Sequence, residues 1–223
     1  MKIIKESLFK NPKNRSPDRR NKILYFGKKA KFKTFGKTYF DGGERHLGYG
    51  EYKYDSRYFK PVKKLVKSLK LEKKDRIIEL GCAKGFILYE FWRLGFRNIL
   101  GQDISRYAKN NSKMAIKKLL VTKCISKIHE KNNSVKFLFC KEVLPHLTIN
   151  KLKKVFSEIN RIIRKDGIIY LEIQTGRTMD SLKKMRQWDP SHKIIKTTFW
   201  WEKTINKYFT RSNNVIVNFK YLF

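Results

Sequence analysis

The fold is decided by one stretch, Arg76-Ile-Ile-Glu-Leu-Gly-Cys-Ala-Lys-Gly-Phe86. Its first half is a short apolar run that is typical of a buried strand, and its second half is a turn bounded by glycines. Gly81 and Gly85 lack a Cβ atom, so the backbone can turn tightly there and a ligand can approach closely. The spacing differs from the G-x-G-x-x-G turn that holds a pyrophosphate, and it therefore favours a nucleoside ligand without phosphates.

Strand-like and helix-like runs alternate on both sides of this stretch. Apolar runs typical of strands lie at 98–103, 119–124, 135–140 and 168–173, and helical spacing lies at 61–69, 86–94, 105–119 and 152–163. Asp166-Gly167 is expected to end the last helix. The alternation predicts right-handed βαβ units around a mostly parallel, doubly wound sheet. Residues 215–223 alternate apolar and polar side chains, which is typical of an edge or antiparallel strand.

The candidate ligand site lies where the first two predicted strands end. In a doubly wound sheet the ligand lies beyond the carboxyl ends of the strands, near the point where strand order reverses. Glu79 is at the end of the first strand, and Asp103 ends the second strand, eighteen residues after Gly85. The Asp103 carboxylate can accept hydrogen bonds from both hydroxyls of a ribose. The alternative is an acid at a helix N-terminus, stabilised by the helix dipole.

These residues resemble the class I S-adenosylmethionine-dependent methyltransferases, a Rossmann-like superfamily. The glycine turn resembles that family's first motif and residues 101–105 its second, while Phe137–Leu147 and Leu152–Ile173 resemble the units of its fourth and fifth strands. The resemblance implies a Rossmann-like, doubly wound, mostly parallel seven-stranded sheet with an antiparallel last strand. It also implies S-adenosyl-L-methionine as cofactor and an enzyme of the EC 2.1.1 type.

The resemblance also implies the site residues. The expected cofactor-binding residues are Glu79, Gly81, Cys82, Ala83, Gly85, Asp103, Ile104, Cys124, Ile125, Lys141, Tyr54 and Arg57. The family's usual adenine-binding acid is missing from residues 122–126, so backbone groups near Cys124 and Ile125 are expected to replace it. Tyr54 and Arg57 are expected to close over the methionine carboxylate, by a charge-assisted pair from the arginine, or else to form a simple surface loop.

Glu142 and His146, which both follow the fourth predicted strand, are candidates for catalysis. Histidine can act as a general base because its unperturbed pKa is about 6.5. The alternative for His146 is a packing role at the start of a helix. A base is needed only if the acceptor is a hydroxyl or a protonated amine. The three cysteines lack C-x-x-C spacing, so they predict buried free thiols and no metal site.

The chain divides by composition into three segments. Residues 1–40 carry a local charge of +11 and predict a loosely ordered basic arm, in which several aromatic residues could dock on the domain. Residues 41–60 are rich in glycine and tyrosine and predict a structured loop or lid. Residues 61–223 are the expected methyltransferase domain.

The charge of the whole chain leaves the acceptor open. The 53 Lys and Arg against 19 Asp and Glu give +34, which indicates either a polyanionic partner or a composition bias. The leading hypothesis is methyl transfer to a small-molecule acceptor such as a sugar or another biosynthetic metabolite. The alternatives are an RNA methyltransferase that uses the basic arm, and a non-catalytic binding protein with a degenerate cofactor site. No apolar run reaches the roughly 18 residues of a membrane span, so a cytoplasmic protein is expected, of undetermined oligomeric state.

Overall fold

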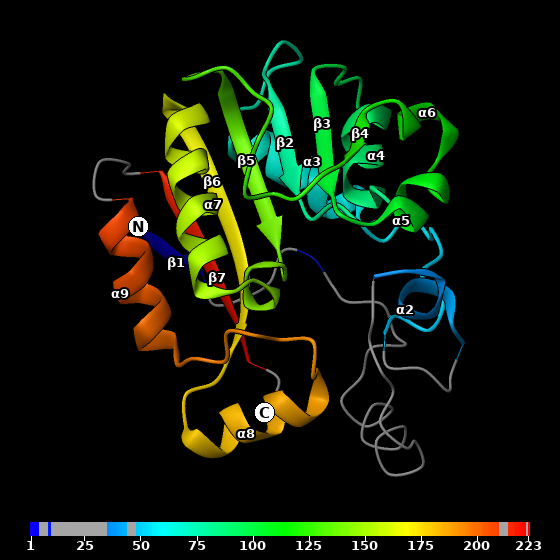
Figure 1. Ribbon diagram of the computed structural model, residues 1–223. Helices are drawn as coiled ribbons and strands as arrows, with labels where there is room; N and C mark the ends of the chain where they lie inside the picture. Colours follow the sequence, from blue (N-terminus) through cyan, green and yellow to red (C-terminus); the bar gives the residue numbers. More distant parts are fainter. Residues whose placement is uncertain (5–8, 10–34, 44–47, 210–213, 222) are drawn as a thin grey trace.

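The computed structural model describes residues 1–4, 9, 35–43, 48–209, 214–221 and 223. Seven strands in this part of the chain form one sheet in the order β1-β7-β6-β5-β2-β3-β4 (Figure 1). They are β1 (Lys2–Ile4), β2 (Ile77–Leu80), β3 (Ile99–Asp103), β4 (Leu120–Thr122), β5 (Val135–Lys141), β6 (Ile163–Thr175) and β7 (Val215–Tyr221). The prediction of a doubly wound, mostly parallel, seven-stranded sheet is confirmed.

The predicted antiparallel last strand is wrong, because β7 runs parallel to β6, with Leu171 opposite Val217. Two helices, α8 (Met179–Trp188) and α9 (Thr198–Tyr208), separate these strands along the chain. A hairpin would have reversed the chain, whereas this long connection returns it to the amino end of β6 before β7 begins. Alternating side chains show that a strand is exposed on one face, but they do not fix its direction.

The amino terminus supplies the strand at the edge of the sheet. β1 pairs in parallel with β7, and Ile3 lies opposite Val217. Phe9 is fully buried in the core. Residues 2–4 and Phe9 of the predicted basic arm thus lie in the sheet and in the core. The rest of that prediction, for residues 5–8 and 10–34, lies outside the described residues.

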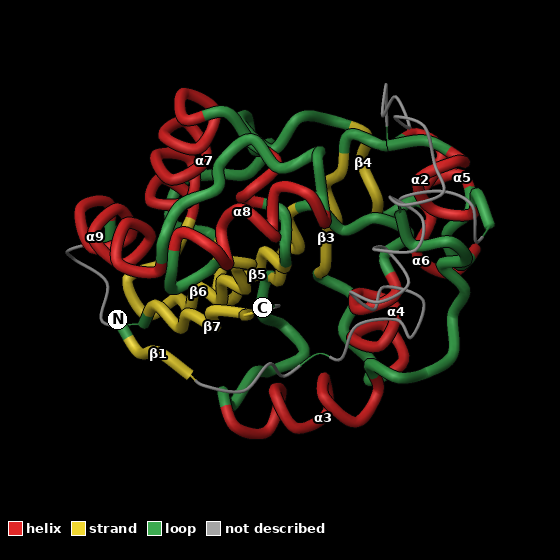
Figure 2. Tube along the Cα trace, turned by 90° about the horizontal axis from the view of Figure 1, so that it is seen from below, coloured by secondary structure: helices red, strands yellow, loops and turns green. Residues whose placement is uncertain are grey.

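Helices cover both faces of the sheet (Figure 2). Helix α7 (Ile149–Ile162) and α9 pack on one face, where Phe156 and Trp201 join a fully buried cluster with Leu138 of β5. Helices α3 (Phe59–Ser68) and α4 (Phe86–Arg93) pack on the other face, against Phe137 and Phe139 of the same strand. Successive residues of β5 thus face opposite layers, as a strand buried on both faces requires.

Two predicted helices have different ends in the structure. The run 105–119 forms two short helices, α5 (Arg106–Asn110) and α6 (Met114–Lys117), because the side chains of Asn111 and Ser112 donate to helix carbonyls and stop the first one. Helix α7 ends at Ile162, four residues before Asp166. The next residue, Ile163, is already extended and begins β6, so Asp166-Gly167 does not end the helix.

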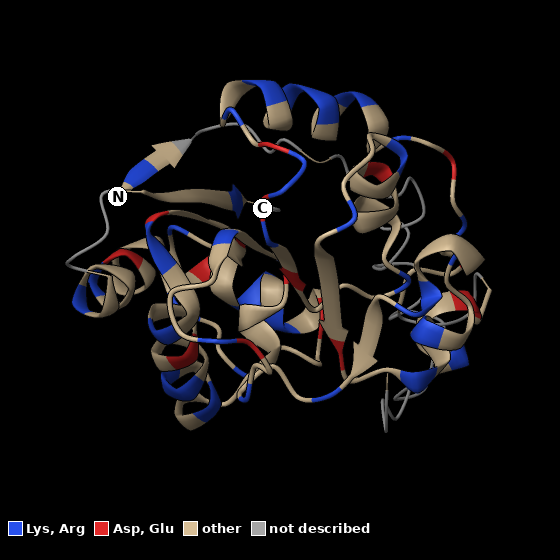
Figure 3. Cartoon of the chain, turned by 90° about the horizontal axis from the view of Figure 1, so that it is seen from above, with Lys and Arg blue, Asp and Glu red and all other residues tan. Residues whose placement is uncertain are grey.

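All three cysteines are free, as predicted, but only Cys82 and Cys140 are buried and Cys124 is exposed. Lys and Arg residues occur along several helices and loops around the sheet (Figure 3). Among the described residues, every helix is too short or too polar to span a bilayer.

Candidate functional site

The glycine turn between β2 and α4 has the backbone conformation that its sequence predicts. Gly81 and Gly85 have φ values of +71° and +69°, and Ala83 between them also has a positive φ, of +49°. A Cβ atom on Gly81 would lie 2.1 Å from a methyl carbon of Val143, so no larger residue fits there. The amide of Gly81 donates to the carbonyl of Gln102 at 2.7 Å, which fixes the turn against the end of β3. These bonds hold the turn at the point where strand order reverses.

Asp103 is fastened to this turn from the end of β3. Its Oδ2 accepts the amide hydrogen of Ala83 at 2.8 Å, and its Oδ1 accepts that of Ser105 at 2.8 Å. Burial raises the pKa of Asp103, and these backbone donors partly offset the effect. The carboxylate is therefore held in one orientation at the wall of a cavity.

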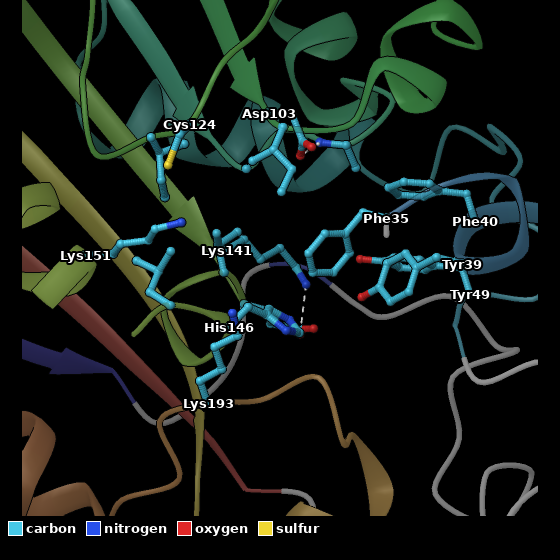
Figure 4. A pocket seen from close by; sticks show the side chains of 17 residues that line it. Phe35, Tyr39, Phe40, Tyr49, Asp103, Cys124, Lys141, His146, Lys151 and Lys193 are labelled. Atoms are coloured by element: carbon cyan, nitrogen blue, oxygen red, sulfur yellow. Dashed lines mark hydrogen bonds and ion pairs between the residues drawn. The ribbon is translucent and has the colours of Figure 1, made fainter. Parts of the chain in front are cut away.

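That cavity, of about 160 Å³, opens beyond the carboxyl ends of β2, β3 and β5 (Figure 4). It is lined by Phe35, Tyr39, Phe40, Tyr49, Gly81, Ala83, Asp103, Ile104, Cys124, Ile125, Lys141, Glu142, Val143, His146, Leu147, Lys151 and Lys193. Nine residues predicted for the site from sequence are in this set, so the structure gathers the glycine turn, the ends of β3 and β5 and the loop after β4 around one space.

Three predicted cofactor-binding residues, one in β2 and two in the turn itself, do not line the cavity. Cys82 is buried in the core, with its Sγ close to Gly101. Gly85 is the N-cap of α4 and faces Ile116. Glu79 is 4% exposed, and its Oε2 has no hydrogen-bond partner among the described residues. Burial, together with the nearby Asp103, raises the pKa of Glu79 well above its usual range.

Tyr54 and Arg57 are also absent from the cavity wall, and the expectation that they close over it is corrected. The hydroxyl of Tyr54 donates to Glu90 Oε1 at 2.8 Å and accepts from Arg93. Arg57 pairs with the neighbouring Asp55. Both side chains are held by partners of their own, so the alternative surface-loop role describes them better.

The cavity is instead covered by residues 35–41, which we call the N-terminal cover. It contains helix α2 (Lys37–Asp41), and Phe35 and Tyr39 face the cavity from the side opposite Cys124 (Figure 4). Asp41 accepts from Lys84 Nζ at 2.6 Å and from the Tyr107 hydroxyl at 2.8 Å. Lys84 belongs to the glycine turn, so one ion pair joins the cover to the turn.

This link is not evident from the sequence, because Lys84 and Asp41 are 43 positions apart. The aromatic residues between 35 and 40 did indicate a segment able to dock. The sequence gives no sign of where such a segment would attach.

A cluster of buried charges borders the cavity after β5. Glu142 Oε1 accepts from Lys141 and from Lys220, each at 2.9 Å, and Glu142 Oε2 accepts from Gln174 at 2.9 Å. Lys141 also lies 3.2 Å from Glu172. Glu142 has a positive φ of 57°. Because both carboxylate oxygens of Glu142 are engaged, the geometry favours a role in orienting Lys141 over the predicted role in catalysis.

His146, the other candidate for catalysis, belongs to the short helix η2 (Leu144–His146) and lines the cavity. Its Nδ1 lies 3.0 Å from the hydroxyl of Ser191, which also bonds to the carboxylate of Asp189. The ring of Phe35 from the N-terminal cover packs edge-on against that of His146, with 5.5 Å between the centroids. The imidazole is thus held from two sides.

Cys124 and Ile125 line the end of the cavity where an adenine is expected. The side chain of Gln102 donates to the carbonyls of Cys124 and Lys127, each at 2.9 Å, and so fixes this loop. The replacement of the missing acid by backbone groups of this loop stays a prediction.

These residues fit the nucleoside-bearing cofactor that the sequence resemblance implies. A turn in which a Cβ would clash leaves room for a ligand, and a pinned carboxylate beside it can bind a ribose diol. Lys141, oriented by two carboxylates, offers a cation at the same wall.

Comparisons with known proteins agree with this geometry. Residues 78–171 match the family described as a methyltransferase domain. No curated protein matches the sequence. The fold is similar to the YcgJ protein of Bacillus subtilis, with a TM-score of 0.55, 14% identity and 66% of each chain covered. It is also similar to a SAM-dependent methyltransferase of Archaeoglobus fulgidus, with a TM-score of 0.52, 15% identity and 66% of each chain covered.

A third similar structure is a phosphoethanolamine N-methyltransferase of Haemonchus contortus in complex with S-adenosylhomocysteine. Its TM-score is 0.52 at 16% identity, and the match covers 67% of this chain and 36% of that one. The matches thus span just under two thirds of the first two relatives and about a third of the last.

Proposed function

We propose that this chain is a class I S-adenosylmethionine-dependent methyltransferase that methylates a small-molecule acceptor, as the match of residues 78–171 to a methyltransferase domain supports. The cofactor, S-adenosylmethionine, supplies a methyl group already activated on a sulfonium. The protein therefore has to align the acceptor with the C–S bond and exclude water. The cavity between the glycine turn and the N-terminal cover offers the space for both molecules.

The observation that carries the proposal is the position of Asp103. Its carboxylate is pinned by the amides of Ala83 and Ser105 at a cavity wall that also includes Gly81. We assign Asp103 to the two ribose hydroxyls, Gly81 and Ala83 to the backbone surface beneath the ribose, and Ile104, Cys124 and Ile125 to the adenine. Lys141 is assigned to the methionine carboxylate, with Glu142 and Glu172 orienting it.

A small acceptor is supported by the enclosure of the cavity. Phe35, Tyr39 and Tyr49 close one side with aromatic faces, and such faces also favour a cationic sulfonium. The remaining side holds His146 and Lys193, which we assign to the acceptor. The sequence hypothesis that His146 removes a proton from a hydroxyl acceptor stays part of this proposal.

The alternative of an RNA acceptor depends on the basic arm, most of which lies outside the described residues. Lys and Arg residues of the described part occur on several helices and loops (Figure 3). A measurement of cofactor binding separates the proposed function from the alternative of a non-catalytic protein with a degenerate cofactor site.

The test is calorimetry of the full chain with S-adenosylhomocysteine. We expect saturable binding by the native protein, no measurable binding by Asp103→Ala, and native affinity for the control Asp180→Ala, whose carboxylate forms an exposed ion pair with Lys184. Unchanged affinity in Asp103→Ala would remove the ribose assignment. An absence of binding by the native protein would favour the non-catalytic alternative.

A further inference from the structure

Three side chains that the cofactor assignment does not use meet beside the cavity. His146 comes from η2, and Asp189 and His192 come from the segment after α8; one ligand atom of each lies within 4.8 Å of the other two. The two imidazole centroids are 4.6 Å apart, and His192 Nε2 is 3.8 Å from Asp189 Oδ2. The side chains of His192 and Asp189 are 0% and 1% exposed. A carboxylate and two imidazoles thus lie close together, with His146 half-buried and the other two residues buried.

The composition of the chain alone does not explain why His146, Asp189 and His192 lie together. The chain has only four histidines and 19 acidic residues against 53 basic ones. Lysines at the cavity wall are expected in such a lysine-rich chain, whereas two of its few histidines beside a buried carboxylate are not. Of the histidines that the structure describes, His129 is the one that lies elsewhere, exposed beside Lys123.

The backbone brings these residues together independently of their side chains. The amides of Lys193 and Ile194 both donate to the carbonyl of Pro145, at 2.8 and 2.9 Å. The amide of Asp189 donates to the carbonyl of Met185 at the end of α8. The segment that carries Asp189 and His192 is therefore fastened against the helix that carries His146.

Ser191 determines which nitrogen of His146 is available. Its hydroxyl donates to Asp189 Oδ1 and lies 3.0 Å from His146 Nδ1. A hydroxyl has one hydrogen, so the hydroxyl oxygen accepts from Nδ1–H, and Nε2 keeps the lone pair in the neutral ring. Metal-bound histidines commonly have such a partner on the other ring nitrogen, where it fixes the tautomer and the ring orientation.

We propose that His146, Asp189 and His192 bind a divalent transition-metal ion, with Zn²⁺ as the first candidate. Two imidazoles and one carboxylate form a known catalytic ligand set, which leaves a further coordination position open. Because these ligand atoms lie within 4.8 Å of one another, an ion between them would lie no more than about 2.8 Å from each. Inward movements of up to about 0.7 Å, within reach of side-chain rotations, would give the usual distances of about 2.1 Å.

The place of this ion site suggests its use, and this step rests on the proposed methyl transfer. His146 lines the cavity, so an acceptor with a hydroxyl or carboxylate oxygen could reach the open coordination position from there. A bound cation lowers the pKa of a coordinated hydroxyl, whose proton would then leave to solvent. With its Nε2 on the ion, His146 would no longer be the general base of the proposed function, and the cation would activate the hydroxyl in its place. The sequence predicted no metal site, and this inference departs from that prediction.

The test measures metal binding separately from activity. The full chain, treated with a chelator and dialysed, is titrated with ZnCl₂ by calorimetry and with CoCl₂ by visible absorption. We expect one ion per chain and cobalt d–d bands for the native protein and for the exposed control His129→Ala. Both signals should be lost in His146→Ala and in His192→Ala. Ser191→Ala, which removes only the outer partner, should weaken binding by about 10- to 100-fold.

Several outcomes would overturn the proposal. One is a native protein that takes up no Zn²⁺, and another is native affinity in both His146→Ala and His192→Ala. Circular dichroism shows whether each variant is folded, and His146→Ala, at a half-buried position, remains informative if the buried His192→Ala does not fold. S-adenosylhomocysteine binding is measured in parallel. Zinc binding without nucleoside binding would refute the proposed function but not the ion site, and the reverse would refute the ion site alone.

Discussion

Asp41→Ala tests whether one ion pair holds the N-terminal cover over the cavity. The side chains of Lys84 and Asp41 are 7% and 22% exposed, and the ammonium also donates to the carbonyl of Tyr52 at 2.9 Å. Removing the carboxylate leaves a buried cation with one neutral partner. Loss of one partner from a fully buried pair costs about 3 to 5 kcal/mol, and the partial exposure of Asp41 reduces this to about 2 to 3 kcal/mol.

The assay is hydrogen exchange at the amide of Tyr49, which donates to the carbonyl of Tyr39 at 2.8 Å. The amide of Tyr52 is not a suitable reporter, because it also donates to Asp41 Oδ1 at 3.0 Å and loses that partner in the variant. A loss of about 2 to 3 kcal/mol in local stability accelerates the exchange of the Tyr49 amide by about 30- to 150-fold, at 1.36 kcal/mol per tenfold. The control Asp55→Ala breaks an exposed pair with Arg57 and should change exchange by less than about fivefold.

A double variant separates the lost pair from a general disturbance. Lys84→Met in the Asp41→Ala background removes the unpaired cation, so exchange should return part of the way toward the native rate. Native exchange rates in Asp41→Ala, or a double variant that exchanges faster than Asp41→Ala, would show that this ion pair does not hold the cover.

Three further outcomes follow from the site and the core. Gly81→Ala should abolish S-adenosylhomocysteine binding in calorimetry, because its methyl group would lie 2.1 Å from a carbon of Val143. The control is Gly43→Ala at a half-buried position, which has a similar positive φ of +78° but no atom within 4 Å of the added methyl group. Burial raises the pKa of the Glu79 carboxyl, so this group holds its proton more tightly in the folded state than in the unfolded state. Its contribution to the free energy of unfolding is fully present below the unfolded pKa of about 4.3, and it is lost as the pH rises through the folded pKa. Urea unfolding should therefore show Glu79→Gln gaining stability relative to the native protein between pH 5 and pH 8, and an equal difference at both would contradict the raised pKa. Phe156→Ala, at a fully buried position, should lower the free energy of unfolding by about 3 to 5 kcal/mol in the same assay, and a loss below 1 kcal/mol would contradict its place in the core.

The parts of the fold that the sequence predicts are those whose signal is local. β2, β3 and β5 are short apolar runs. The glycine turn follows β2 directly and Asp103 is the last residue of β3, so a few neighbouring residues suffice to place them. The ends of α5 and α7 are not predictable from apolar spacing, because that spacing would allow longer helices. A side-chain hydrogen bond from Asn111 ends α5, and the extended backbone at Ile163 ends α7.

The parts that were missed depend on contacts between distant segments. The direction of β7 follows from the path of the chain through α8 and α9, which the pattern of β7 itself does not record. Lys84 and Asp41 are 43 positions apart, and His146 and His192 are 46 apart. Each of these residues is unremarkable alone, and only the packed sheet brings the partners together.

The pairing of β1 with β7 has a consequence for how the protein is made. Residues 2–4 are synthesised more than 200 positions before their partners, residues 216–218. Contacts between such distant positions are slow to form, because a long loop has to close first. Until β7 is synthesised, β6 has an open edge, which is a place where two nascent chains can pair wrongly. This side of the sheet is completed only when β7 pairs with both β6 and β1, so its assembly has to wait for a strand that is made late.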